Sequence, residues 1–172
     1  GDALETLMRS IVGQQISVKA AASVWQKIID LLDEIKPDNV LLVGFDNLRS
    51  CGLSKQKTQY IINIAEHFKS HNINDDSYWH DREFSNIYDE LITIKGIGPW
   101  TAEMFGMFYL LERDIFPLKD LGILKAINQL YCVDGVPLTI DQVVAISDLW
   151  KPYRTVASWY LWRSIDNEAV LY

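Results

Sequence analysis

The chain has 172 residues, of which 49% are hydrophobic and 23% are charged, and this composition is typical of a globular protein rather than a disordered one. Its formal net charge of −7 argues against a generic nucleic-acid binder, although the field over one local surface matters more for DNA binding than the sum of charges. No apolar run approaches the roughly 20 residues of a membrane span, and the first residues lack a secretory signal. Two cysteines are too few for a disulfide framework. We therefore expect an intracellular protein that does not enter a membrane.

Helical periodicity dominates the first half of the chain. Apolar residues at helical spacing predict a first helix that ends at Gly13 and a second helix that Ser17 can cap. The pattern is short and broken across residues 37–52, after which Ser54 is placed to cap a further helix. Residues 71–85 are polar and aperiodic, which predicts a loop.

The second half of the chain also predicts helices. Residues 101–111 (TAEMFGMFYLL) are apolar almost all round, which is typical of a central buried helix. No segment shows sustained two-residue alternation, so we predict an all-α fold. Four further helices are predicted. One covers residues 87–94, one begins at Asp120, one follows a cap at Thr139, and one covers residues 153–163.

One short motif and one carboxylate carry the chemistry that the sequence suggests. Gly96 and Gly98 flank Ile97 directly before an apolar helical run, and glycine permits positive φ and a close approach of another backbone. The free N–H groups at the start of the next helix can hold an anion such as a DNA phosphate. Asp120 follows at the start of a later helix, whose dipole favours negative charge. The alternatives are a simple tight turn for the glycines and an N-cap role for Asp120.

Four ordered segments resemble the helix-hairpin-helix (HhH-GPD) DNA glycosylase superfamily, in particular its 3-methyladenine DNA glycosylase II branch. They are residues 7–22 (LMRSIVGQQISVKAAA), 92–105 (ITIKGIGPWTAEMF), 114–126 (DIFPLKDLGILKA) and 149–163 (LWKPYRTVASWYLWR). Agreement across four segments is far more specific than one short motif. The resemblance implies a two-lobed helical core over residues 1–172, with the hairpin at residues 92–105 and a cleft between the lobes. We expect the N-terminal sheet domain of larger relatives to be absent from these residues, either because this family member is compact or because that part has been removed.

The resemblance assigns the catalytic role to Asp120, because the matching aspartate is the catalytic residue in the family. A carboxylate near the anomeric carbon can stabilise the sugar cation of N-glycosidic hydrolysis, orient water, or do both. Trp100 stands where relatives that also cut the DNA backbone have a Schiff-base lysine. A tryptophan cannot attack a sugar carbon, so we expect a monofunctional glycosylase that leaves an abasic site.

An enzyme that acts on a buried base must fill the gap that the base leaves and must receive the flipped base. Gln14 and Gln15 lie in a loop that matches the family's wedge loop, and Gln15 falls at the inserting position. Well-studied bacterial relatives have an apolar residue at this position. The alternative is that the loop is a simple connection between two helices. An aromatic pocket would attract the positive charge of an alkylated purine, although core packing is the alternative for each aromatic residue. The pocket residues that the resemblance implies are Trp100, Trp162, Met104 and Leu121, the last two standing where a relative has tyrosines.

Further DNA contacts are expected along the hairpin. They are the main chain at Gly96 and Gly98, Thr101, and Lys95, which is either a phosphate contact or a solvated charge. Family members often bind a monovalent cation through hairpin carbonyls, and we expect no required cofactor. The three histidines show no metal-ligand spacing, so no metal held by side chains is expected.

These expectations combine into one function. We expect a base excision repair enzyme that acts as a monomer on damaged double-stranded DNA and hydrolyses the N-glycosidic bond of alkylated purines such as 3-methyladenine and 7-methylguanine. Its compartment would be the cytoplasm or nucleoid, or the nucleus of a eukaryote. The alternatives are a glycosylase for another damaged or mismatched base, a non-catalytic DNA-lesion binding module, and a helical protein-interaction domain.

Overall fold

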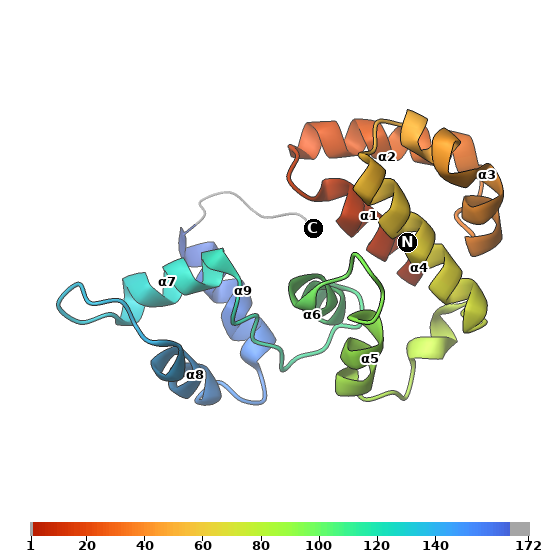
Figure 1. The fold of residues 1–172 in the computed structure, drawn as a ribbon. Coiled ribbons are helices and arrows are strands. Elements are labelled where there is room, and N and C mark those ends of the chain that lie inside the picture. Colours follow the sequence, from red (N-terminus) through yellow and green to blue (C-terminus); the bar gives the residue numbers. More distant parts are fainter. Residues whose placement is uncertain (1, 166–172) are drawn as a thin grey trace. The chain divides into compact units, whose positions relative to one another are not determined.

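The computed structural model describes residues 2–165, and every regular element in that part of the chain is a helix (Figure 1). The helices form two compact units: Ala102 is the last residue of the first unit, and Glu103 is the first residue of the second. The predicted all-α fold is therefore confirmed, while the predicted cleft between two lobes stays a prediction. None of the described helices is both long and apolar enough to cross a membrane.

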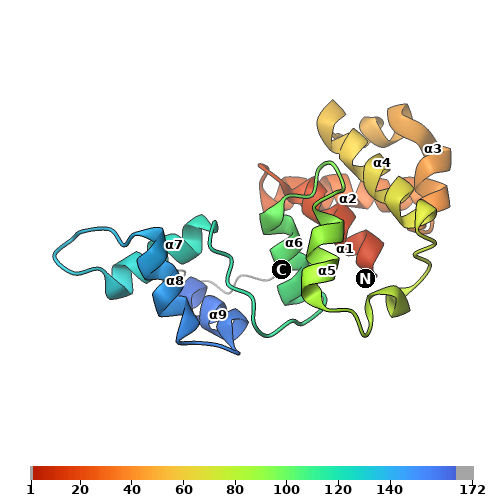
Figure 2. The same ribbon diagram turned by 60° about the horizontal axis from the view of Figure 1, so that its bottom comes forward.

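The first unit is organised around α4, which packs against α1 and α3, while α2 also packs against α1 and α3 (Figures 1 and 2). Leu4, Leu7, Met8 and Ile11 share one face of α1 at helical spacing, and all four are buried. The elements of this unit are α1 (Ala3–Gly13), α2 (Val18–Leu32), α3 (Pro37–Ser50), α4 (Lys55–Ser70), the 3-10 helix η1 (Asp76–Trp79), α5 (Phe84–Leu91) and the beginning of α6 (Pro99–Phe108).

Side-chain caps fix where the helices of the first unit begin. Ser17 Oγ accepts a hydrogen bond from the N–H of Ala20 at 3.2 Å, and Ser54 Oγ accepts one from the N–H of Lys57 at 3.2 Å. Both predicted caps are therefore confirmed. Gly44 has a φ of +78° inside α3 and kinks it, which explains the broken sequence pattern of this region.

The second unit contains the rest of α6, α7 (Leu121–Tyr131), α8 (Ile140–Asp148) and α9 (Arg154–Ile165). Its main packing contact joins α7 to α9. The loop before α7 is attached to the start of α9: Arg154 Nε donates to Asp114 Oδ1 at 2.8 Å, and Thr155 Oγ1 donates to the carbonyl of Glu112 at 2.7 Å and accepts from the N–H of Ile115 at 3.0 Å. These contacts hold the chain that leads to Asp120.

The predicted loop at residues 71–85 contains regular structure. Asp75 accepts a hydrogen bond from the N–H of Ser77 at 2.8 Å and starts η1, and Trp79 at its end is 3% exposed. A short turn of this kind has no helical periodicity, so the sequence pattern could not distinguish it from a loop. Helix α5 likewise begins at Phe84 and ends at Leu91, three residues earlier at each end than predicted.

The predicted central helix at residues 101–111 is shorter at its C-terminal end than its apolar run suggested. Helix α6 begins at Pro99 and ends at Phe108. Leu111 has a φ of +57° and is 78% exposed, so it lies beyond the helix. Proline at the first helical position explains the earlier start, because its missing N–H would have no intrahelical partner there.

Candidate functional site

Asp120 lies at the N-cap of α7 in the second unit. Its Oδ1 accepts hydrogen bonds from the N–H of Ile123 at 2.8 Å and from Trp162 Nε1–H at 2.9 Å. The N-cap role that the sequence left open is therefore real. The capping role and catalysis are compatible, because both hydrogen bonds hold the carboxylate in one orientation.

Gly122 allows this close arrangement of the carboxylate and the indole. A Cβ atom on Gly122 would lie 3.1 Å from Asp120 Oδ1 and 3.2 Å from Trp162 Cδ1. Any side chain there would press on both groups, whereas glycine leaves them in place. The sequence analysis did not single out this residue. Its only signal was a glycine in the first turn of a helix, two residues after an acidic N-cap.

Trp162 is a core residue as well as a partner of Asp120. Its side chain is 6% exposed, and its ring stacks on Phe108 at a centroid distance of 6.0 Å and an interplanar angle of 29°. The structure thus brings Trp162 to Asp120 and orients the carboxylate through it. Met104 on α6 is half-buried, and Leu121 is 82% exposed at the first position of α7. The pocket roles of these residues stay predictions.

Glu103, on the part of α6 in the second unit, is a titratable group that the sequence analysis missed. Burial raises the pKa of its carboxyl group to about 7; the positive charge of Lys119 acts against this, and the negative charge of Asp120 adds to it. Its Oε2 atom is buried and has no hydrogen-bond partner. An acidic residue within an otherwise apolar helix was the available sequence signal. The result is a partly protonated carboxyl group within electrostatic reach of Asp120.

The hairpin between α5 and α6 belongs to the first unit, and its two glycines differ. Gly96 has a φ of +118°, and a Cβ atom there would lie 2.6 Å from Tyr60 Cβ, so glycine is required. A Cβ atom on Gly98 would meet nothing within 4 Å, so the space beside this residue is open. The Asn63 side chain holds the turn by donating to the carbonyl of Lys95 at 2.9 Å.

The first turn of α6 follows this hairpin. Trp100 is 41% exposed there, whereas Thr101 is only 5% exposed. The DNA contact predicted for Thr101 thus falls on a residue with little exposed surface. Lys95 is exposed at the turn. The roles predicted for these residues in DNA binding stay predictions.

The loop between α1 and α2 has an unusual backbone at its tip. Gln15 has a φ of +58°, in the left-handed region that few residues other than glycine adopt, and it is exposed. Lys57 Nζ donates to the carbonyls of Val12 at 2.8 Å and Gln14 at 2.6 Å. The loop is therefore held by a lysine of α4 that the sequence analysis did not select.

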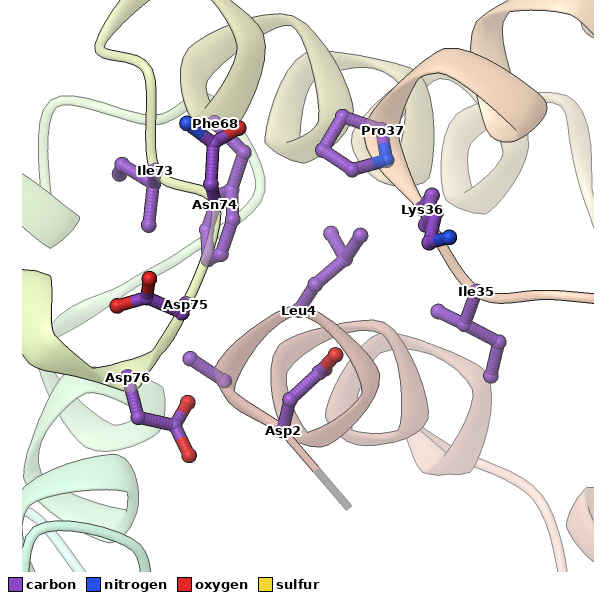
Figure 3. Close-up of a pocket in the computed structure, with 11 residues that line it drawn as sticks. Asp2, Leu4, Ile35, Lys36, Pro37, Phe68, Ile73, Asn74, Asp75 and Asp76 are labelled. Carbon is purple, nitrogen blue, oxygen red and sulfur yellow. The ribbon is translucent and has the colours of Figure 1, made fainter.

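A separate cavity of about 120 Å³ lies in the first unit, and none of the predicted site residues lines it (Figure 3). Leu4 points into it, with Phe68 on one side and Pro37 on the other. Asp2 and Asp75 at its rim accept hydrogen bonds from backbone N–H groups as helix caps. The cavity is small beside the roughly 300 Å³ of a typical ligand site, so we interpret it as a packing feature.

No group of three or more His, Cys, Asp or Glu side chains that could hold a metal ion occurs within residues 2–165. A monovalent cation on the hairpin carbonyls stays a prediction.

Comparison with known proteins identifies the family. The model of the HhH-GPD superfamily of base excision DNA repair proteins matches residues 8–152. The chain belongs to the HhH-GPD superfamily. The resemblance predicted from the four sequence segments is thus confirmed.

Relatives and solved structures point to one branch of this superfamily. DNA-3-methyladenine glycosylase 1 of Schizosaccharomyces pombe is 31% identical over 93% of this chain and 71% of its own length. The YfjP protein of Bacillus subtilis is 30% identical over 93% of this chain, which spans 58% of that protein. The crystal structure of DNA-3-methyladenine glycosidase from Bacillus halodurans has a TM-score of 0.84 and 34% identity, covering 95% of this chain and 76% of that one. The S. pombe 3-methyladenine DNA glycosylase in complex with abasic DNA has a TM-score of 0.80 and 30% identity, and the match covers 95% of this chain and 80% of that one.

Proposed function

We propose that this protein is a monofunctional DNA glycosylase that removes alkylated purines such as 3-methyladenine and 7-methylguanine from duplex DNA. The observation that carries the proposal is the carboxylate of Asp120, which Trp162 and the N–H of Ile123 hold in one orientation. This arrangement stands in a chain whose relatives are named as DNA-3-methyladenine glycosylases. A glycosylase for another damaged or mismatched base is the alternative.

The chemistry proposed for Asp120 is stabilisation of a sugar cation. The bond between C1′ and the purine nitrogen breaks, and its electron pair leaves with the base. A cationic alkylated base departs as a neutral molecule, so this step needs no strong general acid. Water adds to C1′ and loses a proton to solvent, which leaves an abasic site. The negative charge of Asp120 favours the cation and can orient the water.

The proposed DNA contacts lie in the first unit. The N-terminal end of α6 would bind a phosphate through its backbone N–H groups, with the open space beside Gly98 admitting the DNA strand. Gln15 would fill the gap left by the flipped base. The relative solved in complex with abasic DNA supports DNA as the partner. Trp100 in place of a lysine supports hydrolysis without strand cleavage.

Release of free base from methylated duplex DNA tests this function. Asp120→Asn removes the charge but keeps a good N-cap residue, so folding should be retained. We expect base release to fall by about 100-fold or more, the scale of losing one electrostatic stabiliser of a transition state. Asp134→Asn, an exposed position with a φ of +56° that asparagine tolerates, is the matched control.

The outcomes separate the candidate functions. Equal base release by the wild type and Asp120→Asn would rule out the assigned role of Asp120. Lesion binding without base release by the wild type would identify a non-catalytic binding module. Release of a mismatched or oxidised base in preference to a methylated one would favour the alternative glycosylase.

A further inference from the structure

Two loops with proposed DNA contacts are attached to the same helix, α4, in the first unit. The loop after α1 is held by Lys57, and the turn between α5 and α6 lies beside α4 (Figure 1) and is held by Asn63. Tyr60, between these two residues, lies directly against Gly96. Lys57 and Asn63 are six residues apart, or about 9 Å along the helix axis. One rigid element thus sets the spacing of both loops.

The hydrogen bonds of Lys57 end on main-chain carbonyls rather than on a carboxylate. They are the carbonyls of Val12 and Gln14, at the C-terminal end of α1. The last carbonyl groups of a helix lack intrahelical partners, and the helix dipole favours a cation there. The last turn of α1 has no basic residue of its own, so Lys57 supplies this cation from α4. Burial lowers the pKa of Lys57, as expected of an ammonium group that lies beneath a loop.

The bond to Gln14 acts directly on the conformation of Gln15. The carbonyl of Gln14 belongs to the peptide plane that joins it to Gln15, so holding that carbonyl fixes the plane from which Gln15 extends. Gln15 has a φ of +58°, a conformation that costs an ordinary residue free energy and needs support from its surroundings. The Lys57 bond at 2.6 Å provides such support.

We propose that Lys57 is a positioning residue for base flipping, which holds Gln15 ready to enter the duplex at a fixed distance from the strand bound by the hairpin. This role rests on the proposed glycosylase function. A loop that is ordered before binding loses less conformational entropy when it inserts, so the flipped state is favoured. Without Lys57, the loop would have to be ordered during each flipping event.

The Lys57→Met variant tests the proposal, because it keeps an unbranched apolar side chain of nearly the same length and removes the ammonium group. Two substrates are compared in single-turnover assays: a methylated purine paired in a duplex, and the same lesion opposite an abasic site, where little unstacking is needed. We expect the variant to lose about tenfold in rate on the paired lesion, the scale of one charged hydrogen bond. On the unpaired lesion the loss should be about twofold or less, because little flipping energy is required. The control is Lys55→Met, the same change at an exposed position of α4, which should leave both rates within about twofold.

Two further results would overturn the role of Lys57. If Lys57 acts through Gln15, then Lys57→Met and Gln15→Ala should be non-additive in the double variant, and additive losses would contradict it. An equal loss on paired and unpaired lesions would show a general structural effect instead.

A readout that does not depend on catalysis keeps this proposal separate from the proposed function. The fluorescence of 2-aminopurine placed opposite the lesion reports loop insertion whether or not the base is cleaved. We expect the change in fluorescence on binding to be smaller in Lys57→Met than in the wild type, and an unchanged signal would overturn the positioning role. In another outcome, the wild type inserts its loop in a way that depends on Lys57 and yet releases no base from the paired or the unpaired lesion. That result would contradict only the glycosylase function.

Discussion

Side chains build the candidate site around Asp120, whereas main-chain groups build the hairpin around Gly96. In the second unit, the Trp162 indole donates directly to the Asp120 carboxylate. In the first unit, the side chains of Lys57 and Asn63 hold carbonyl groups, and the loops present their backbone. A substitution can therefore remove a functional group directly at Asp120, whereas at Gly96 it acts by changing the backbone conformation.

The largest effect on stability is expected for Gly96→Ala. Alanine would have to adopt a φ of +118° and place its Cβ atom against Tyr60, so the hairpin must shift. We expect a loss of roughly 3 kcal/mol in the free energy of unfolding, from backbone strain and overpacking together. Denaturant unfolding measures this loss, and affinity for an abasic-site duplex should fall with it.

Gly98→Ala is the matched control for this prediction. Its Cβ atom would meet nothing within 4 Å of the folded chain, so the free energy of unfolding should change by about 0.5 kcal/mol or less. DNA affinity should still decrease, because the added methyl group occupies the space proposed for the DNA strand. Equal destabilisation by the two variants would show that the backbone at Gly96 is not special.

An intermediate effect on activity is expected for Trp162→Phe. Phenylalanine keeps most of the buried ring but removes the Nε1–H donor that holds Asp120. Losing a hydrogen bond to a charged group costs about 1.5 kcal/mol or more, so the single-turnover rate of base release should fall about tenfold. Trp159→Phe, on the exposed side of the same helix, should retain the wild-type rate. A fall in DNA affinity with no fall in rate would instead support a base-stacking role for Trp162.

The smallest effect concerns the pH dependence of stability and involves Glu103. Its pKa is about 7 in the folded protein and 4.5 in its ordinary state. The native state therefore binds a proton more tightly than the unfolded state, and this contribution to stability is present below about pH 4.5 and is lost as the pH rises through 7. Glu103→Gln should remove this loss, which is about 1 to 2 kcal/mol after a discount for partial solvent exposure.

Denaturant unfolding of the wild type and Glu103→Gln at pH 5 and pH 8 checks this. The wild type should lose stability relative to the variant as the pH rises, and a constant difference at both pH values would disprove the raised pKa. Because the comparison is between two pH values, any constant cost of placing an amide at this position cancels.

Local signals in the sequence were sufficient for most of the fold. Serine caps, helical periodicity and the acidic residue before α7 act within a few positions along the chain, so Ser17, Ser54 and Asp120 could be placed correctly as caps. The positions predicted for the ends of α6 were wrong, and the turn η1 was missed. An apolar run does not show where backbone hydrogen bonding stops, as the exposed Leu111 demonstrates.

The residues that support the candidate sites were harder to predict, because their partners lie far away in the sequence. Lys57 contacts carbonyls more than 40 positions earlier, and Gly122 matters only because Trp162 packs beside it. Glu103 is exceptional only through its burial near Lys119 and Asp120. A single sequence contains no signal for such pairs, whereas a resemblance to a family transfers only the residues that the family's motifs contain.

The left-handed backbone at Gln15 also limits which side chains can serve at the tip of that loop. Valine, isoleucine and threonine are branched at Cβ and clash most severely with such a backbone, while glycine, asparagine and side chains that are not branched at Cβ are tolerated better. A redesigned tip intended to intrude more strongly into DNA should therefore use methionine or leucine rather than isoleucine. Homologous chains that keep this backbone should be under the same restriction, so diversity at the tip is expected to exclude β-branched residues.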